Sequence, residues 1–189
     1  FLISFEKFDV RRANAADNNK ETVNLRIIGT TDLHGQLNSF DYEQGVAYNN
    51  GGLARVFDLI QKTKAELPEG HTITLDAGDN LYDFTTEYIF SENQEAIQPI
   101  FKALKLVGYD AITLGNHDFD YGYDYILKQL DGSGMRDITV VSNVTDARTG
   151  EHPFLENMLL TRTLKTKSGN EVEIKIGIIG HTIPHLTGK

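Results

Sequence analysis

Three short polar motifs each follow an apolar, strand-like run, and together they carry residue types that bind divalent metals. The motifs are Asp32-Leu33-His34, Gly78-Asp79-Asn80 and Gly115-Asn116-His117-Asp118. Carboxylates and imidazoles are common transition-metal ligands, and two metals held close together are a recurrent device for hydrolysing phosphate esters. One such motif would be a weak indication. Three in this order predict a two-metal site for breaking phosphate esters.

Each motif taken singly has a simpler interpretation, because Asp, Asn and Gly are also favoured in turns and at helix N-termini. Their position favours a shared site, since they follow the apolar runs at residues 25–30, 72–75 and 111–114. In open α/β sheets the ligand lies beyond the carboxyl ends of the strands. Asp32 and His34 are two residues apart, so in an extended chain both side chains would point the same way.

Strand-like and helix-like runs alternate along the chain, which predicts a largely parallel sheet covered by helices. Apolar residues at helical spacing predict helices over residues 51–67, 94–107 and 123–130. Further strands are expected at residues 138–141, 159–164 and 171–179, with a hairpin turn at 166–170. The Gly51-Gly52 pair either allows close packing beside the site or simply starts the first helix.

The bulk composition excludes several classes of protein. The 189 residues are 40% hydrophobic and 24% charged, which is ordinary for a globular domain with a real core. A formal net charge of −9 argues against a nucleic acid polymer as partner. No apolar run reaches the roughly 18 residues of a transmembrane segment. The absence of cysteine excludes disulfides, thiolate metal ligands and a cysteine nucleophile.

The first 22 residues are interpreted as a leader that precedes the domain at residues 23–189. Flexibility is expected at residues 14–20, where Asn, Ala and Asp gather. The tripeptide at 13–15 superficially matches a signal-peptidase site, but residues 6–12 are too polar for the apolar part of a signal peptide.

The three motifs resemble those of the calcineurin-like metallophosphoesterases, specifically the 5′-nucleotidase branch and the bacterial 2′,3′-cyclic-nucleotide 2′-phosphodiesterase/3′-nucleotidases within it. Residues 30–35 (TTDLHG), 115–125 (GNHDFDYGYDY) and 143–149 (NVTDART) carry the likeness further, and it spans roughly residues 24–189. The resemblance implies a layered α/β/β/α sandwich, here incomplete at its C-terminus. Residues 23–189 would then be the N-terminal part of the catalytic domain.

The resemblance also implies a set of metal ligands. Asp32 and His34 would bind the first of two divalent metal ions, Asp79 would bridge both, and Asn116 would bind the second. Mn, Zn and Fe are all compatible with such ligands. The metals would clamp the phosphoryl oxygens and activate a water for in-line attack, so that no protein nucleophile is required.

His117 has a different implied role, because it would lie against the phosphate and stabilise charge that builds up in the transition state. Asp120 would hold the His117 imidazole in orientation and favour its protonated form. Asp76, Asp118 and Asp124 are expected to be structural.

The sequence defines the roles of the remaining histidines less closely. Family members supply further metal-binding histidines downstream, including a Gly-His-x-His-type motif that these residues do not contain. His181 follows a strand and is a candidate substitute ligand, and the role of His185 is left open. His71 and His152 lie in turn-like segments and are expected to be solvated.

The expected activity is hydrolysis of nucleotide phosphoesters, as in a 2′,3′-cyclic nucleotide phosphodiesterase or 3′-nucleotidase. A 5′-nucleotidase or nucleotide-sugar hydrolase of the same family is the alternative, because Asp120 and the bulky segment 81–86 depart from the cyclic phosphodiesterase pattern. An alternative of another class is a truncated module that binds a metal or phosphate without turnover. The resemblance further implies a C-terminal nucleotide-binding domain in the full-length protein and an extracytoplasmic location, periplasmic, cell-wall or secreted.

Overall fold

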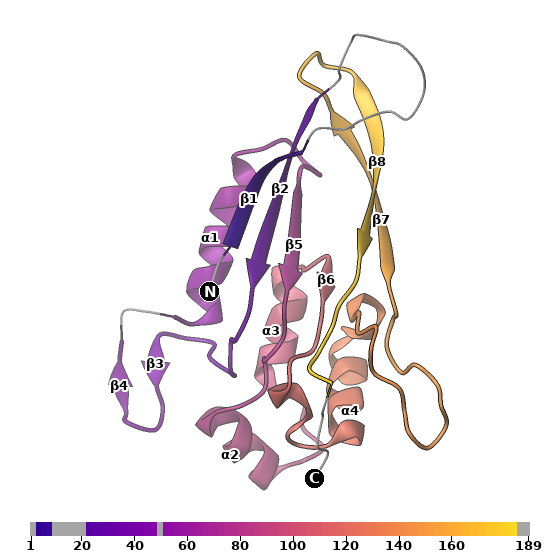
Figure 1. Ribbon diagram of the computed structural model, residues 1–189. Coiled ribbons are helices and arrows are strands. Elements are labelled where there is room, and N and C mark those ends of the chain that lie inside the picture. Colours follow the sequence, from indigo (N-terminus) through magenta and orange to yellow (C-terminus); the bar gives the residue numbers. More distant parts are fainter. Residues whose placement is uncertain (1–2, 9–21, 49–50, 185–189) are drawn as a thin grey trace.

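The centre of the fold is a four-stranded sheet in the order β1-β2-β5-β6 (Figure 1). The computed structural model describes residues 3–8, 22–48 and 51–184. Strands β2 (Val23–Thr30), β5 (Thr72–Asp76) and β6 (Ala111–Ile112) are parallel, whereas β1 (Ile3–Phe8) pairs antiparallel with β2. The three parallel strands therefore end at one edge of the sheet, and each of the three polar motifs follows one of these ends.

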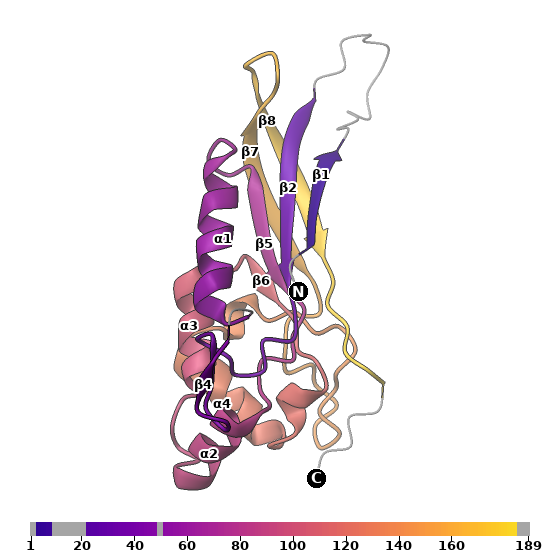
Figure 2. The ribbon, with the colours of Figure 1, turned by 90° about the vertical axis from the view of Figure 1, so that its left-hand side faces the viewer.

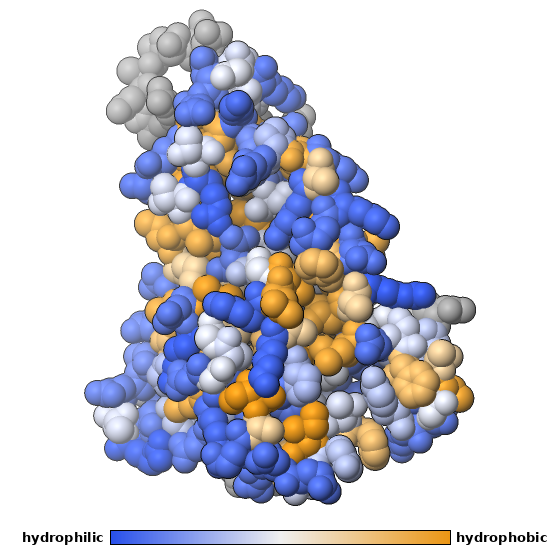
Figure 3. Space-filling model, turned by 180° about the vertical axis from the view of Figure 1, so that it is seen from behind, coloured by the Kyte–Doolittle hydropathy of each residue, from blue (hydrophilic) through white to orange (hydrophobic). Residues whose placement is uncertain are grey.

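Helices cover one face of this sheet (Figure 2). They are α1 (Leu53–Ala65), α3 (Pro99–Val107) and α4 (Tyr123–Ser133), while α2 (Phe84–Glu92) lies beyond the strand ends. The main apolar core fills the space between helices and sheet, with Ile28, Ile60 and Leu104 each 0% exposed. Seen from behind, the helical face carries mostly hydrophilic residues with scattered apolar ones between them (Figure 3). This is the pattern of amphipathic helices that turn an apolar stripe to the core.

A long antiparallel hairpin packs on the sheet through a second, smaller core. Its strands are β7 (Met158–Lys165) and β8 (Glu171–Ile178), joined by the predicted turn at 166–170. Leu164 of the hairpin packs with Val23, Leu25 and Ile73 of the sheet. Helices, sheet and hairpin are three layers of the expected α/β/β/α sandwich, and the α/β fold class is confirmed.

Several elements differ from the sequence prediction. The helix expected over 94–107 begins only at Pro99, whose ring favours the first turn of a helix. The strand expected at 138–141 is wrong, because residues 136–138 form the 3-10 helix η2 (Arg136–Ile138) and only isolated bridges follow. The predicted strand at 111–114 is reduced to Ala111–Ile112. Helix α2 was missed, and only Thr86 of its residues is buried, so it shows little apolar periodicity.

The N-terminal segment contains an element that the sequence did not predict. Residues 3–8 form strand β1 at the edge of the sheet, inside the segment interpreted as a leader. The flexibility expected at residues 14–20 concerns positions outside the described residues, so it stays a prediction. No helix in the described part of the chain has the length and apolar character needed to cross a membrane.

His71 is a buried structural residue, and the prediction of a solvated loop histidine is wrong. Its side chain is covered where the hairpin packs on the sheet, so that the residue is 3% exposed. Nδ1 lies 2.7 Å from the carbonyl oxygen of Asn24, and Nε2 accepts the backbone N–H of Lys165 at 3.1 Å. His71 therefore connects β2 to β7. His152 is exposed, as predicted.

Candidate metal centre

The first two polar motifs are joined backbone to backbone at the ends of β2 and β5. The N–H groups of Asp32 and His34 donate to the carbonyl oxygens of Gly78 and Asp79, both at 3.0 Å. Asp32, His34 and Asp79 have φ values of 55°, 46° and 55°, in the left-handed region that costs an L-residue roughly 1–2 kcal/mol. Such conformations persist where the surrounding structure enforces them, and they concentrate at functional sites.

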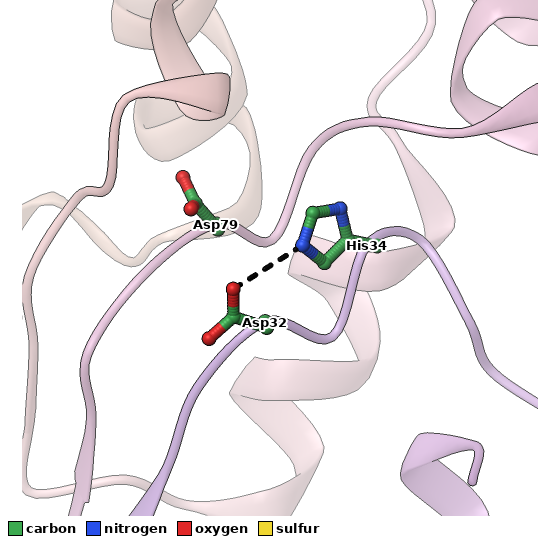
Figure 4. Close-up of side chains that lie close together, drawn as sticks. All are labelled: Asp32, His34 and Asp79. Carbon is green, nitrogen blue, oxygen red and sulfur yellow. Dashed lines mark hydrogen bonds and ion pairs between the residues drawn. The ribbon is translucent and has the colours of Figure 1, made fainter. Parts of the chain in front are cut away.

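These φ values correct one step of the sequence argument. Asp32 and His34 do not lie in extended chain, yet they still meet, with Oδ1 of Asp32 lying 3.4 Å from Nε2 of His34 (Figure 4). They meet because the loop that follows β2 is hydrogen-bonded to the loop that follows β5, and not because side chains alternate along a strand.

Asp32, His34 and Asp79 form the group that is suited to hold a metal ion. One potential ligand atom from each lies within 4.8 Å of the others. Asp32 is exposed, and the other two are half-buried. The Thr31 hydroxyl donates to Oδ2 of Asp32 at 2.5 Å and holds the pKa of that carboxyl below its usual value. Two carboxylates and an imidazole are a suitable donor set for Mn, Zn or Fe, so the residues fit the expected ion.

The third motif lies directly against Asp79. Oδ1 of Asp79 accepts the backbone N–H of His117 at 2.8 Å. A Cβ atom on Gly115 would lie 2.1 Å from the same oxygen, and one on Gly78 would lie 2.2 Å from the backbone nitrogen of Gly115. Glycine is therefore required at both positions for the loops to approach. Asn116 lies between the two residues that contact Asp79, and its role as a metal ligand stays a prediction.

Asp118 braces the loops from behind and is fully buried. Its carboxylate accepts four backbone N–H groups at 2.9 Å, from Asp79, Asn80, Leu81 and Gly115. Burial raises its pKa to about 7, against the opposing effect of these donors. The structural role expected for Asp118 is confirmed.

Asp76 is the second buried carboxyl beneath the site. Oδ2 accepts from the Thr30 hydroxyl at 2.5 Å, while Oδ1 accepts from the Asn80 amide at 2.7 Å and from the Gly78 N–H at 3.0 Å. Burial raises the pKa of Asp76 to about 6. Its partners are structural groups, in agreement with the expected role. Asp124, by contrast, is exposed and lies 3.5 Å from Arg148 in an ion pair.

His117 and Asp120 form the predicted pair. Nδ1 of His117 lies 2.7 Å from Oδ2 of Asp120, and this hydrogen bond raises the pKa of the imidazole. The ring centroids of His117 and His34 are 5.6 Å apart, so the pair borders the metal-binding group. The geometry suits a protonated imidazole that faces an anion at the metal centre.

Tyr82 is a site residue whose position was not foreseen. Its ring centroid lies 4.2 Å from that of His117 and 5.3 Å from that of His34, and its φ is 133°. In the sequence, the bulky side chains of residues 81–86 were the only indication that this loop is unusual. The left-handed bend that brings the ring against both imidazoles, edge-on to His34 and tilted to His117, depends on tertiary structure.

The later histidines contribute nothing to this group among the described residues. His181 is exposed and is not part of the Asp32, His34 and Asp79 group. His185 lies outside the described residues, so its role stays open.

Comparison with known proteins identifies the family to which the chain belongs. The calcineurin-like phosphoesterase family matches residues 25–168, which is most of the chain. The chain therefore belongs to the calcineurin-like phosphoesterases, a family of metal-dependent hydrolases.

Two curated relatives and one solved structure illustrate which members of the family the chain is similar to. It is 32% identical, over 98% of its length, to the 2′,3′-cyclic-nucleotide 2′-phosphodiesterase/3′-nucleotidase of Salmonella typhimurium, of which it covers 28%. It is 33% identical to the 5′-nucleotidase of Vibrio vulnificus over 85% of its length, covering 26% of that protein. The crystal structure of the calcineurin-like phosphoesterase YfkN from Bacillus subtilis superposes with a TM-score of 0.76 at 31% identity, over 86% of this chain and 49% of that one. The chain thus spans about a quarter of the length of these two curated relatives.

Proposed function

We propose that the protein hydrolyses nucleotide phosphoesters with two divalent metal ions, as a 2′,3′-cyclic-nucleotide phosphodiesterase and 3′-nucleotidase. The observation that carries the proposal is the convergence of Asp32, His34 and Asp79 within 4.8 Å, beside the His117–Asp120 pair. The similarity to the Salmonella typhimurium enzyme supports the choice of substrate class.

Each site residue has a separate role in this proposal. Asp32 and His34 would hold one ion, Asp79 would be a ligand to both ions, and Asn116 would be a ligand to the second. When bound, such ions neutralise phosphate charge and lower the pKa of a water so that it can attack at neutral pH. His117 donates a hydrogen bond to the phosphoryl oxygens as negative charge accumulates there.

Asp120 keeps the imidazole of His117 protonated and oriented, through the 2.7 Å contact to Nδ1. Because Nδ1 is engaged by the carboxylate, Nε2 is the nitrogen left to face the phosphate. The proposal also includes a C-terminal nucleotide-binding domain in the full-length protein and an extracytoplasmic location.

The test is an assay of the protein with 2′,3′-cyclic AMP, 3′-AMP and 5′-AMP, each with added Mn²⁺ or Zn²⁺. Hydrolysis of the first two in preference to 5′-AMP is expected, and the opposite order would assign the protein to the 5′-nucleotidases. Asp79→Asn should abolish turnover and bound metal, whereas Asp58→Asn, an exposed carboxyl on α1, should change neither. Inactivity toward every phosphoester, with stoichiometric metal bound, would leave a non-catalytic metal-binding module.

A further inference from the structure

Tyr82 places an aromatic ring against two histidines of the site. Its ring centroid lies 4.2 Å from that of His117, with 32° between the ring planes, and 5.3 Å from that of His34, with 78° between them. The ring therefore lies closer to face-to-face with His117 and meets His34 edge-on. The two imidazoles are themselves 5.6 Å apart, so the three rings form one closed group. A single tyrosine thus contacts both a candidate metal ligand and the histidine expected to face the phosphate.

The backbone of Tyr82 is held in a conformation that a tyrosine rarely adopts. Its φ is 133°, and that of Asp83 is 80°. The carbonyl oxygen of Tyr82 accepts the hydroxyl of Thr86 at 2.9 Å, and the N–H of the buried Leu81 donates to Asp118 at 2.9 Å. Such conformations persist where the surrounding structure enforces them, and they cluster at functional sites. Here the enforced bend brings the ring to the imidazoles instead of the core, and Tyr82 stays 44% exposed.

The side chain of His117 needs a restraint of this kind. Its backbone N–H is held by Asp79, but Nδ1 is bonded to Asp120 through two partly exposed side chains, 32% exposed in His117 and 47% in Asp120. A bond between groups so open to solvent contributes little, and it fixes only one atom of the ring. Packing of the Tyr82 ring against the imidazole restrains its tilt, which that bond leaves free.

We propose that Tyr82 is a positioning residue, whose ring holds the His117 imidazole so that Nε2 faces a phosphate at the metal centre. This inference rests on the function proposed above. Tyr82 acts only through His117 and is a ligand neither to the metal ions nor to the phosphate. Its effect on the rate comes from orienting a hydrogen-bond donor, because displacement of a reacting group by about 1 Å can cost 10²-fold.

A double-mutant cycle tests whether Tyr82 acts through His117. For the phosphoester that the wild type hydrolyses fastest, Tyr82→Leu should lower kcat by about tenfold, while KM and bound metal stay within about twofold, because a transition-state donor loses its orientation. In the His117→Asn background the same substitution should not lower kcat further, since the oriented group is already absent. An equal loss in both backgrounds would overturn the proposal. Loss of metal from Tyr82→Leu would do so too, because Tyr82 would then act on His34.

Two single variants are the controls. The contacts are made by the ring, so Tyr82→Phe should keep kcat within about twofold of the wild type. Tyr42 is 53% exposed, and its ring also contacts a second aromatic ring, that of Phe40. It follows β3 (Phe40–Asp41), which pairs with β4 (Val46–Ala47) in a hairpin that contributes no residue to the metal-binding group. Tyr42→Leu should therefore leave kcat unchanged. A Phe variant as slow as Tyr82→Leu would contradict the proposal, because the hydroxyl and not the ring would then be required.

A nuclear magnetic resonance measurement tests the ring contact without turnover. In protein with ¹³C-labelled histidine and Zn²⁺ as the added ion, the resonances of His117 are assigned by their absence from His117→Asn. The ring current of Tyr82 should shift them upfield from those of the exposed His152, because the rings of Tyr82 and His117 are 4.2 Å apart and within 32° of parallel. Tyr82→Leu should remove this shift and Tyr82→Phe should keep it.

The outcomes separate the positioning role from the proposed function. Resonances of His117 that are unaltered in Tyr82→Leu would refute the positioning role and leave the proposed function intact. If the wild type hydrolysed no phosphoester, the proposed function would fail instead, and the spectrum would decide on its own whether Tyr82 holds the imidazole.

Discussion

The carboxylate of Asp118 holds the backbone of Asp79, whose N–H it accepts at 2.9 Å. Asp118 thus fixes the main chain of Asp79. In return, Oδ1 of Asp79 accepts the backbone N–H of His117. The second and third motifs are locked together in both directions. The bridging role that we propose for Asp79 requires this fixed geometry, because misplacement of a reacting group by about 1 Å can cost 10²-fold in rate.

Asp118→Asn should destabilise the fold without changing the shape of the side chain. An amide can present only one acceptor oxygen, so two of the four backbone N–H groups would lose their partner. Each unsatisfied buried donor costs about 1–3 kcal/mol, so for the two donors a loss of roughly 2–6 kcal/mol in the free energy of unfolding is expected. Urea denaturation at about pH 4 measures it, with Asp58→Asn as the exposed control, because near the ordinary pKa of 3.8, and well below the raised pKa of about 7, the wild-type Asp118 bears little of the ionisation cost that the Asn variant lacks. A variant as stable as the wild type would show that the carboxylate does not clamp the loops.

His117→Asn should lower kcat by roughly 10²–10³-fold while metal content stays unchanged, because one hydrogen-bond donor to the transition state is lost. Asp120→Asn should have a smaller effect, about tenfold, since the imidazole remains but loses the carboxylate that raises its pKa. Elemental analysis measures the bound metal and steady-state kinetics measure turnover, so together they distinguish a metal ligand from a residue that acts on the phosphate. Loss of metal from the His117 variant would contradict its assignment to the phosphate.

Asp76→Asn should change the pH dependence of stability. Burial raises the pKa of Asp76 from 3.8 to about 6, so its protonated form stabilises the folded state below pH 3.8, and this contribution is lost as the pH rises through about 6. The Asn variant does not titrate. Its stability relative to the wild type should therefore rise between pH 4 and pH 7.5, by up to about 3 kcal/mol. Urea denaturation across this range measures the difference, and a difference that is independent of pH would refute the shift.

His71→Ala should loosen the hairpin from the sheet. It removes the acceptor for the Lys165 N–H and the partner of the Asn24 carbonyl, so a loss of about 2–4 kcal/mol in the free energy of unfolding is expected. His152→Ala, an exposed position, should change stability by less than about 0.5 kcal/mol. Hydrogen exchange should localise the effect in the His71 variant to β7 and β8. Equal stability of the two variants would contradict the structural role.

The polarity pattern around residues 32–34, 78–80 and 115–118 was sufficient to predict where the site forms. Apolar runs before each motif specify strands, and strands that alternate with helices make a parallel sheet, so their carboxyl ends share an edge. The elements that escaped prediction lack such a pattern. Helix α2 buries only Thr86, and β6 pairs with β5 over only two residues, Ala111 and Ile112.

The sequence by itself determined the donor types, their order along the chain and the edge of the sheet at which they meet. The resemblance implied different roles for Asp79 and Asp118, and only the tertiary structure supplied the contacts by which the Asp118 carboxylate holds the backbone of the second motif. Asp79 and Asp118 are alike in sequence context, but they differ in hydrogen-bond partners that lie 37–39 residues away. It also decided that His71 is buried, through a contact 94 residues away. Local patterns encode secondary structure, whereas burial and hydrogen-bond partners arise from contacts between segments that folding alone brings together.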